Sequence, residues 1–369
     1  MTVNAAWNIW NFRKPLVEAL LADGHRIAVL APPDDASEKL AELGCEVRPL
    51  AMSVNGLNPL QDLLLARRFS QNFRKTAPDI VLSYTIKNNI FGAGAAKAVG
   101  VPFVPNVTGL GTAFLSGQLL EKVSVQLYRR AFADLPRVFF QNADDRELFI
   151  DYGIVREEQT RLLPGSGIDL QRFAPAVLPD PSQPPVFLMI ARLLRDKGVV
   201  EFVDAARAIR AQHPAARFQL LGALGPQNRT AIDPPMVEAW VEQGVVEYLG
   251  STDDVRPYIA AASCVVLPSY REGAPRTLIE AAAMARPVIA TDVPGCRAVM
   301  EEGISGFLCQ VRNAGSLADA FRRFIALPVA ARAAMGAAGR AKMSREFDQA
   351  LVIQAYREAI AALVRKQSA

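Results

Sequence analysis

Short apolar runs alternate with longer amphipathic stretches along most of the chain. In the first half, the runs predict buried strands at Arg26–Ala31, Glu46–Leu50, Ile80–Tyr84, Pro102–Val107, Arg137–Asn142 and Thr160–Pro164. The stretches between them predict helices at about Ala36–Leu43, Pro59–Thr76, Asn88–Ala98, Ser116–Ala133 and Asp144–Tyr152. Met1–Val3 is only the stub of a strand, and an amphipathic helix ending at Ala22 follows it. Such alternation predicts parallel strands with helices on both faces of a sheet.

A second alternating series follows a proline-rich break. The segment APAVLPDPSQPP at 174–185 has no hydrophobic periodicity, and we interpret it as a linker. After it, strands are predicted at Val186–Ala191, Ala216–Gly222, Val245–Leu249, Cys264–Leu267, Pro287–Thr291 and Gly306–Cys309, with helices between them and at Ser316–Leu327 and about Asp348–Arg365. The sequence therefore predicts two doubly wound α/β domains, 1–173 and 186–347. In such sheets, ligands bind in the loops at the carboxyl ends of the strands.

Composition excludes several classes of protein. The 369 residues have a formal net charge of +4 and a pI of about 8.9, which is too weakly basic to indicate nucleic-acid binding. Two histidines outside any motif and four scattered cysteines give no pattern of a histidine-based triad, a metal site or a disulfide framework. No Asp-X-Asp sequence occurs, so we expect no metal-dependent transfer chemistry. No signal peptide and no run of about 20 apolar residues is visible, which favours a cytoplasmic protein.

The stretch from Ser269 to Asp292 combines a loop after a buried strand with a helix and the next strand. Gly273 allows the backbone to turn tightly, and Pro275 suits the first position of a helix. The N–H groups that follow, near Arg276 and Thr277, would face an anion at the start of the helix. The sequence therefore predicts an anion site in this loop.

Two glutamates in the same stretch are eight residues apart. Glu272 lies in the loop, and Glu280 lies about two turns down the helix. This spacing could place one carboxylate near a sugar and the other near a ribose, with a diphosphate between them. Because glutamates on a helix more often form a solvated face, the pair alone does not establish a site.

The first strand of the second domain ends in a loop with two cations, Arg192 and Lys197. Arginine offers a planar fork of donors and lysine a point charge, and both suit phosphate oxygens. Because the strands are parallel, this loop and the Glu272 loop should open on the same edge of the sheet. The combination of both loops is more informative than either alone.

Together these residues resemble glycosyltransferase family 4, the retaining enzymes of the GT-B fold, over nearly the whole chain. The matching pieces of the second half are Arg192…Lys197-Gly198, Gly165-Ser-Gly-Ile-Asp169-Leu-Gln-Arg-Phe173 and Glu272-X7-Glu280. The first half is similar to bacterial transferases that build capsule, O-antigen or lipid-linked glycans on a polyprenyl diphosphate. The residues that carry this likeness are Trp7-Asn8, Asn11-Phe12-Arg13, Asn58-Pro59, Ser83-Tyr84-Thr85-Ile86-Lys87, Asn106-Val107-Thr108-Gly109-Leu110-Gly111 and Phe139-Phe140-Gln141-Asn142.

The resemblance implies a nucleotide-sugar donor, with a UDP-sugar expected, and roles for four charged residues. Arg192 and Lys197 would neutralise the donor diphosphate and stabilise it as it leaves. Glu272 would contact the donor sugar near the reacting centre, and Glu280 would accept hydrogen bonds from the ribose hydroxyls. No cofactor and no metal are expected, because the nucleotide-sugar is a co-substrate. The leaving phosphate itself can assist the acceptor hydroxyl, so no histidine base is needed.

The resemblance also implies a set of contacts around the donor. The N–H groups from Ala274 to Thr277, Pro275 excepted, would bind phosphate, and the backbone around Leu249 would hold the base. Gly109 and Gly111 would line the crevice from the first domain. The predicted donor-binding residues are thus Glu280, Gly273, Ala274, Pro275, Arg276, Thr277, Leu249, Gly109 and Gly111. The last helix, about 348–365, is expected to pack back on the first domain.

On the acceptor side we predict roles for Asn8, Lys87 and Thr108, with a lipid-linked saccharide as the acceptor. The helix at Pro59–Thr76 carries four cations against one acid, Asp62. Further apolar and basic residues lie at Phe114, Leu115, Leu119, Leu120, Lys122, Arg129 and Arg130. Basic and apolar residues together can hold a protein on an anionic leaflet, which here would be the inner face of the plasma membrane, although an ordinary amphipathic helix is an equal alternative.

Two departures from the family pattern limit the transfer of roles. Many members carry a His-Asp pair where this chain has Thr108-Gly109-Leu110-Gly111, so no histidine role is transferable. The glycine-rich loop expected after the first strand is replaced by Asn4-Ala-Ala-Trp7-Asn8. The sequence favours a hexosyl- or N-acetylhexosaminyltransferase. A UDP-sugar 2-epimerase on the same fold and a catalytically silent scaffold of a polysaccharide assembly complex remain as alternatives.

Overall fold

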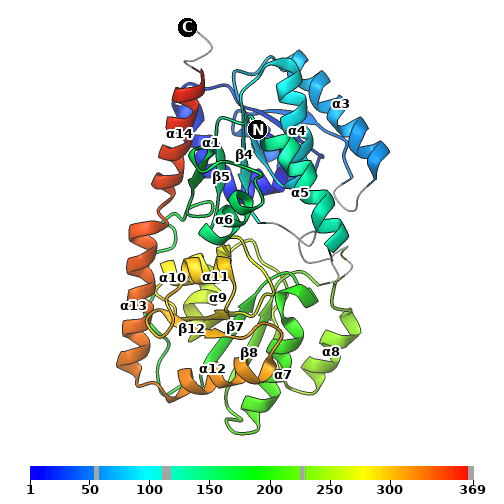
Figure 1. The fold of residues 1–369 in the computed structure, drawn as a ribbon. Helices are drawn as coiled ribbons and strands as arrows, with labels where there is room; N and C mark the ends of the chain where they lie inside the picture. The colour runs from blue at the N-terminus through cyan, green and yellow to red at the C-terminus, as the bar shows by residue number, and fades with distance from the viewer. Residues whose placement is uncertain (54–57, 110–117, 225–227, 229, 365–369) are drawn as a thin grey trace. The chain divides into compact units, whose positions relative to one another are not determined.

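The chain folds into two compact units, each built around its own parallel sheet (Figure 1). The computed structural model describes residues 1–53, 58–109, 118–224, 228 and 230–364. Unit 1 comprises Met1–Gly167 and Gln349–Ala369, and unit 2 comprises Ile168–Asp348. The predicted parallel α/β architecture is confirmed in both units.

The sheet of unit 1 is assembled from two sets of strands that the first residues of the chain join. The strands are β1 (Ala28–Ala31), β2 (Glu46–Pro49), β3 (Val81–Tyr84), β4 (Phe103–Val107), β5 (Val138–Phe140) and β6 (Thr160–Leu162). β1 pairs with β2, and β3 to β6 pair in chain order, all in parallel. Thr2 forms parallel bridges to both Leu30 and Ser83, so the stub predicted at the start of the chain connects β1 to β3.

Helices cover both faces of this sheet, because successive apolar side chains of a strand point to opposite faces and both faces must be buried. The helices of unit 1 are α1 (Ala6–Ala22), α2 (Ala36–Glu42), α3 (Pro59–Thr76), α4 (Ile86–Val99), α5 (Gln118–Phe132), α6 (Ala143–Asp151) and α14 (Gln349–Val364). Leu82 and Tyr84 belong to a core shared with α1, α2 and α14, whereas Val81 belongs to a core shared with α3 to α6. The last helix thus packs on unit 1, where it contacts α1.

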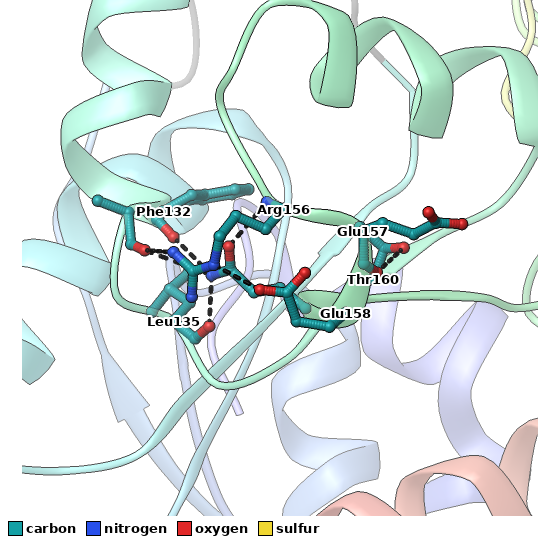
Figure 2. A network of polar contacts seen from close by, with 8 residues as sticks. Phe132, Leu135, Arg156, Glu157, Glu158 and Thr160 are labelled. Atoms are coloured by element: carbon teal, nitrogen blue, oxygen red, sulfur yellow. Dashed lines mark hydrogen bonds and ion pairs between the residues drawn. The ribbon is translucent and has the colours of Figure 1, made fainter.

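A polar network fixes the turn before β6 against the end of α5 (Figure 2). The amide of the buried Gln159, in the short 3-10 turn Glu157–Gln159, donates to Phe132 O at 3.2 Å and to Leu135 O at 2.6 Å. Its oxygen accepts from the backbone N–H of Arg156 at 2.8 Å. One buried side chain therefore bonds three backbone groups, in addition to the bond that Phe132 O accepts from Leu135 N at 3.2 Å.

Unit 2 contains a six-stranded parallel sheet in the order β12-β11-β10-β7-β8-β9. The strands are β7 (Val186–Ile190), β8 (Arg217–Leu221), β9 (Glu247–Tyr248), β10 (Cys264–Leu267), β11 (Val288–Thr291) and β12 (Gly306–Cys309). The helices are α7 (Val199–Arg210), α8 (Pro234–Glu242), α9 (Arg256–Ala261), α10 (Arg276–Ala283), α11 (Pro294–Val299), α12 (Ala314–Ala326) and α13 (Val329–Glu346). α7, α8 and α12 pack on one face, and α9, α10 and α11 pack on the other.

The unit boundary differs from the expected domain boundary and linker. Unit 2 begins at Ile168, so residues 168–173 and the stretch 174–185 lie within it rather than in the first domain and in a free linker. The buried Arg286 explains the difference, because its guanidinium donates to Ala176 O at 2.8 Å and to Val177 O at 2.5 Å. The proline-rich stretch is therefore held against unit 2 by hydrogen bonds that its lack of periodicity could not predict.

Candidate functional site

The order of strands in unit 2 defines where a ligand should bind. β7 comes first in the chain and lies between β10 and β8, so the direction of winding reverses between β7 and β10. In open parallel sheets, ligands bind outside the carboxyl ends of the strands at this switch point. The loops that leave β7 and β10 are the two loops with the predicted charged residues.

The structure brings the two loops into direct contact through an ion pair. Lys197 Nζ lies 2.5 Å from Glu272 Oε1, and both side chains are largely buried. Arg192, at the start of the same loop, is exposed, and no carboxylate among the described residues pairs with it. The edge thus presents one exposed cation beside one cation held by a carboxylate, which suits a ligand with negative charge.

Backbone contacts fix the distance between the two loops. Gly198 has φ of +77°, and a Cβ there would lie 2.1 Å from Pro268 O, so only glycine allows this approach. The N–H of Tyr270 donates to Asp196 O at 2.9 Å, and its hydroxyl donates to Glu201 Oε1 at 2.7 Å. Lys197 is therefore positioned by the fold and not only by its own ion pair.

The N-terminus of α10 faces this edge. The helix begins at Arg276, with Pro275 as its N-cap residue rather than its first helical residue, and no side chain caps it. The N–H groups of Ala274 and Thr277 donate to no acceptor within the part of the chain that the structure describes. Such N–H groups, together with the helix dipole, favour a bound anion. Gly273 completes the loop, and at Gly295 a Cβ would meet Gly273 O at 2.5 Å, so α11 supports the turn from behind.

Glu280 is buried on α10 rather than part of a solvated face. Its Oε1 accepts from Arg276 Nε at 2.6 Å, one turn earlier on the helix. Burial raises the pKa of Glu280, while the charges of Arg276 and Arg172 act in the opposite direction. A buried carboxylate with a raised pKa and a specific charged partner marks a candidate for a ligand-binding group.

The backbone near Leu249 follows β9, which lies two strands from β7 along the same sheet. The N–H of Leu249 donates to Leu220 O at 2.9 Å, and the Tyr248 hydroxyl donates to Gly222 O at 3.1 Å. At Gly222 a Cβ would lie 1.8 Å from Ala191 O, so β7 and β8 end in close contact. The predicted base-binding segment is therefore held rigidly beside the loop that follows β7.

The predicted acceptor-side residues lie in unit 1, and each of them has its own separate contacts. Asn8 Oδ1 accepts from Arg13 Nη1 at 2.5 Å, and Lys87 pairs with Asp62 at 2.9 Å with both side chains about nine-tenths buried. Thr108 is partly exposed after β4 and is followed by Gly109, whose φ is +141°. Within the described part of unit 1, no hydrogen bond links Asn8, Lys87 and Thr108 to one another. The predicted Gly111, and the apolar residues Phe114 and Leu115, lie outside the described residues, as do the side chains of Leu119 and Leu120.

The structure also shows a polar cluster in unit 1 to which the sequence assigned no role. The Arg13 guanidinium lies over the Tyr84 ring, 3.9 Å from its centroid, and Asn106 Nδ2 donates to the Tyr356 hydroxyl at 3.0 Å. These four side chains are buried and line a small cavity at the carboxyl ends of β3 and β4. The signal that could have indicated part of this cluster is the polar groups within apolar runs, Tyr84 at the end of β3 and Asn106 within β4.

The described residues show neither a metal cluster nor a membrane span. No group of three or more His, Cys, Asp or Glu side chains among them is arranged to hold a metal ion. In the same residues, no helix has both the length and the apolar character needed to cross a bilayer.

Two family models match the chain, one in each unit. "Glycosyl transferase 4-like domain" matches residues 10–165, and "Glycosyl transferases group 1" matches residues 184–326. Together the two matches span most of the chain. The chain belongs to the family 4 glycosyltransferases, and it is an enzyme of that class with the GT-B fold.

Known proteins with similar chains agree with this assignment. The N,N'-diacetylbacillosaminyl-diphospho-undecaprenol alpha-1,3-N-acetylgalactosaminyltransferase of Campylobacter jejuni subsp. jejuni serotype O:2 is 28% identical over 86% of each chain. The UDP-Gal:alpha-D-GlcNAc-diphosphoundecaprenol alpha-1,3-galactosyltransferase of Escherichia coli is 27% identical over 68% of this chain and 67% of the relative. The crystal structure of Anabaena Alr3699/HepE in complex with UDP-glucose is similar with a TM-score of 0.76 and 22% identity, covering 94% of each chain, which shows the fold.

We expect Gly198→Ala to impair both stability and glycosyltransferase activity. The strained positive φ alone costs about 1–2 kcal/mol, and the contact with Pro268 O would also displace Lys197 from Glu272. Turnover should fall at least about tenfold, because small displacements of a positioned group have large kinetic effects. Gly244→Ala is the matched control, since Gly244 has φ of +66° but nothing within 4 Å of its added Cβ. Thermal unfolding and turnover of both variants test this prediction, and equal turnover in the two would contradict it.

Proposed function

We propose that this glycosyltransferase transfers a sugar from a UDP-sugar to a saccharide linked to polyprenyl diphosphate, with retention of anomeric configuration. The observation that carries the proposal is the Lys197–Glu272 pair beside the start of α10, at the switch point of the sheet. The names of two relatives support the substrates, because both mention a diphospho-undecaprenol acceptor and one names UDP-Gal as donor. The transferred sugar would be a hexose or an N-acetylhexosamine.

The donor diphosphate would lie between the loop after β7 and the start of α10. Arg192 and Lys197 would supply positive charge, and the N–H groups of Ala274 and Thr277, which have no acceptor among the described residues, would donate to the phosphate oxygens. Charge grows on the diphosphate as it leaves, so these preorganised groups stabilise the transition state more than the ground state. The same groups would replace a metal ion, and we therefore propose that transfer persists in the presence of a chelator such as EDTA.

Glu272 would contact the donor sugar while holding Lys197 at the diphosphate. The ion pair, with Lys197 Nζ 2.5 Å from Glu272 Oε1, would keep the lysine in place for the diphosphate. Retention would follow if the leaving phosphate accepts the proton of the acceptor hydroxyl on the same face of the sugar. This route needs no side-chain base, and the chain has only two histidines, both outside the site.

Glu280 would accept hydrogen bonds from the ribose hydroxyls, and this predicts a pH dependence. Its pKa is raised above the ordinary value of 4.5, so affinity for UDP should fall as the pH is lowered through that raised pKa, because the protonated carboxyl accepts fewer hydrogen bonds. Glu280→Gln should bind UDP about tenfold more weakly at neutral pH and lack this dependence. Titration calorimetry from pH 5 to 8 on both proteins measures it. The phosphate of UDP titrates equally in the two experiments, so a pH-independent ratio of the two affinities would contradict this role.

The acceptor would be held by unit 1, and the enzyme would work at the inner face of the plasma membrane. We keep Asn8, Lys87 and Thr108 as proposed acceptor-side residues, with Gly109 lining the same end of β4. Because Lys87 is paired with Asp62, it would bind an acceptor phosphate only by exchanging its partner. A lipid-linked acceptor also implies peripheral contact of the enzyme with the membrane.

The substrates are tested by nucleotide release from a panel of UDP- and GDP-sugars with and without a short polyprenyl-diphosphate saccharide. We expect release that requires one UDP-sugar and the acceptor together, and an anomeric configuration of the product equal to that of the donor. A product formed from the donor without acceptor would favour a UDP-sugar 2-epimerase or a hydrolase. Binding of UDP without release under every acceptor would favour a silent scaffold.

A further inference from the structure

The first two turns of α3 expose three leucines to solvent. Leu60, Leu63 and Leu64 have exposed fractions of 76%, 70% and 49%, and their spacing of three and four residues places them on one side of the helix. The opposite side, with Leu65 and Phe69, is buried against the core of unit 1. The sequence indicates a basic face of α3, and the structure adds this apolar patch.

The remaining turns of the same exposed side are basic. Arg67, Arg74 and Lys75 are exposed, and none has a carboxylate partner among the described residues. Arg68 is also exposed, but it donates to Ala51 O at 2.6 Å. The single acid of the helix is buried and neutralised by Lys87, so it does not offset this charge.

We infer that this side of α3 is a docking surface for an anionic lipid bilayer. The surface consists of Leu60, Leu63, Leu64, Arg67, Arg74 and Lys75, and Figure 1 shows α3 packed beside α4 on unit 1. A protein partner would be expected to meet an apolar centre surrounded by a polar rim. Here the apolar groups occupy one end of the helix and the cations the other, an order that matches the change from acyl chains to phosphates across a leaflet.

The dimensions of the helix fit such an interface. Leu60 to Leu64 spans about 6 Å and Arg67 to Lys75 about 12 Å at a rise of about 1.5 Å per residue. Apolar groups of interfacial helices enter the headgroup and acyl boundary by about 5–10 Å. With its start tilted into the leaflet, α3 would bury the leucines at that depth and leave the three cations at the level of the phosphates. The helix start is capped, because Asn58 Oδ1 accepts from Leu60 N at 3.2 Å and from Gln61 N at 3.3 Å.

The test is sedimentation of the full chain with vesicles of phosphatidylcholine alone or with about 30% phosphatidylglycerol. The wild-type protein should bind the anionic vesicles and lose most of this binding at high salt, since each cation near the surface contributes about tenfold or less in affinity. Leu60→Ser/Leu63→Ser/Leu64→Ser should bind at least about tenfold more weakly. Arg67→Gln/Arg74→Gln/Lys75→Gln should lose the preference for phosphatidylglycerol.

A matched control separates this surface from general loss of exposed apolar residues. Val177→Ser/Ile304→Ser/Val329→Ser removes three exposed apolar side chains from unit 2 and should bind as the wild type does. Absence of wild-type binding, or equal binding by the leucine variant and the control, would overturn the inference. Concentration-dependent dimers lost in the leucine variant without vesicle binding would also overturn it in favour of a second copy of the chain.

The inference rests on the proposed lipid-linked acceptor for its biological setting, but its test does not. The vesicle assay contains neither donor nor acceptor, so it can fail or succeed independently of the transfer assay. The leucine variant should keep wild-type turnover with a short-chain acceptor, because its residues lie outside the proposed substrate contacts. Loss of that turnover together with a lowered melting temperature would indicate misfolding, and Leu63→Ser alone would then be measured, with binding equal to that of the wild type counting against the surface.

Discussion

Lys197→Met is expected to reduce turnover by about 10²–10³-fold, the effect typical of removing one preorganised group that stabilises developing negative charge. Lys197 lies at the carboxyl end of β7 and 2.5 Å from Glu272, so its loss removes positive charge from the place where the diphosphate would leave. Nucleotide release at saturating donor and acceptor measures the effect. Arg195→Met is the matched control, because Arg195 is an exposed cation in the same short turn and should be replaceable with little change.

Glu272→Ala tests the other half of the pair. When the carboxylate of Glu272 is removed, Lys197 loses the partner that holds it at the edge of the sheet. The donor sugar would also lose a contact. Because the two residues act as a unit, the double variant should be little worse than the more impaired single variant. A Glu272→Ala protein with full turnover would refute the role assigned to that residue.

Arg286→Met is expected to have the largest effect on stability, lowering the free energy of unfolding by about 3–5 kcal/mol. The guanidinium is fully buried and donates to four carbonyls, those of Ala176, Val177, Ile259 and Ala260. Burial lowers its pKa to about 10, so it stays charged at neutral pH. Methionine fills a similar volume but leaves the carbonyls of Ala176, Val177 and Ala260 without this donor, which is costly, while Ile259 O still accepts from Ala262 N at 3.2 Å.

Thermal unfolding should show this as a fall in melting temperature of about 10 °C, at roughly 2–4 °C per kcal/mol for a unit of this size. Arg286→Lys should recover only part of the loss, because one ammonium cannot donate in four directions. Arg345→Met provides the control, since Arg345 is exposed and its pair with Glu346 contributes little to stability. An unchanged melting temperature for Arg286→Met would contradict the view that the proline-rich stretch is fixed by this residue.

The sequence predicted the elements whose local signals agree with their burial. β10 was found at its predicted bounds, Cys264–Leu267, because a fully buried parallel strand is a continuous apolar run. α3 was also found at its predicted bounds, since Asn58 and Pro59 mark its start in the way that capping requires. Both signals are local in the sequence, although β10 itself pairs with the distant strand β7.

The helix α13 was not predicted because its sequence lacks an apolar stripe. Residues 329–346 consist largely of alanine, glycine and basic residues, so the spacing of apolar residues does not indicate a buried side of a helix. The structure shows why small residues are needed there: at Gly336 a Cβ would lie 2.1 Å from Ala285 O. The close approach of two backbones is a tertiary requirement that only the fold makes visible.

Parts of the site could be predicted in the same way, and parts could not. The meeting of Lys197 and Glu272 follows from parallel strands, which bring the ends of β7 and β10 to one edge. The partner of Lys87 could not be predicted, because Asp62 is 25 residues earlier and the packing of α3 on α4 decides their contact. The exposed leucines of α3 were missed for a related reason. The core uses only one side of the helix, and the pattern does not say which leucines lie on it.

The central claim is that the edge formed by β7 and β10 binds the donor nucleotide, and a crystal structure with UDP tests it most directly. The account predicts diphosphate oxygens at the N–H groups of Ala274 and Thr277 and near Lys197 Nζ, with the ribose hydroxyls at the carboxylate of Glu280. A nucleotide bound elsewhere on unit 2, or on unit 1, would contradict the assignment of these residues.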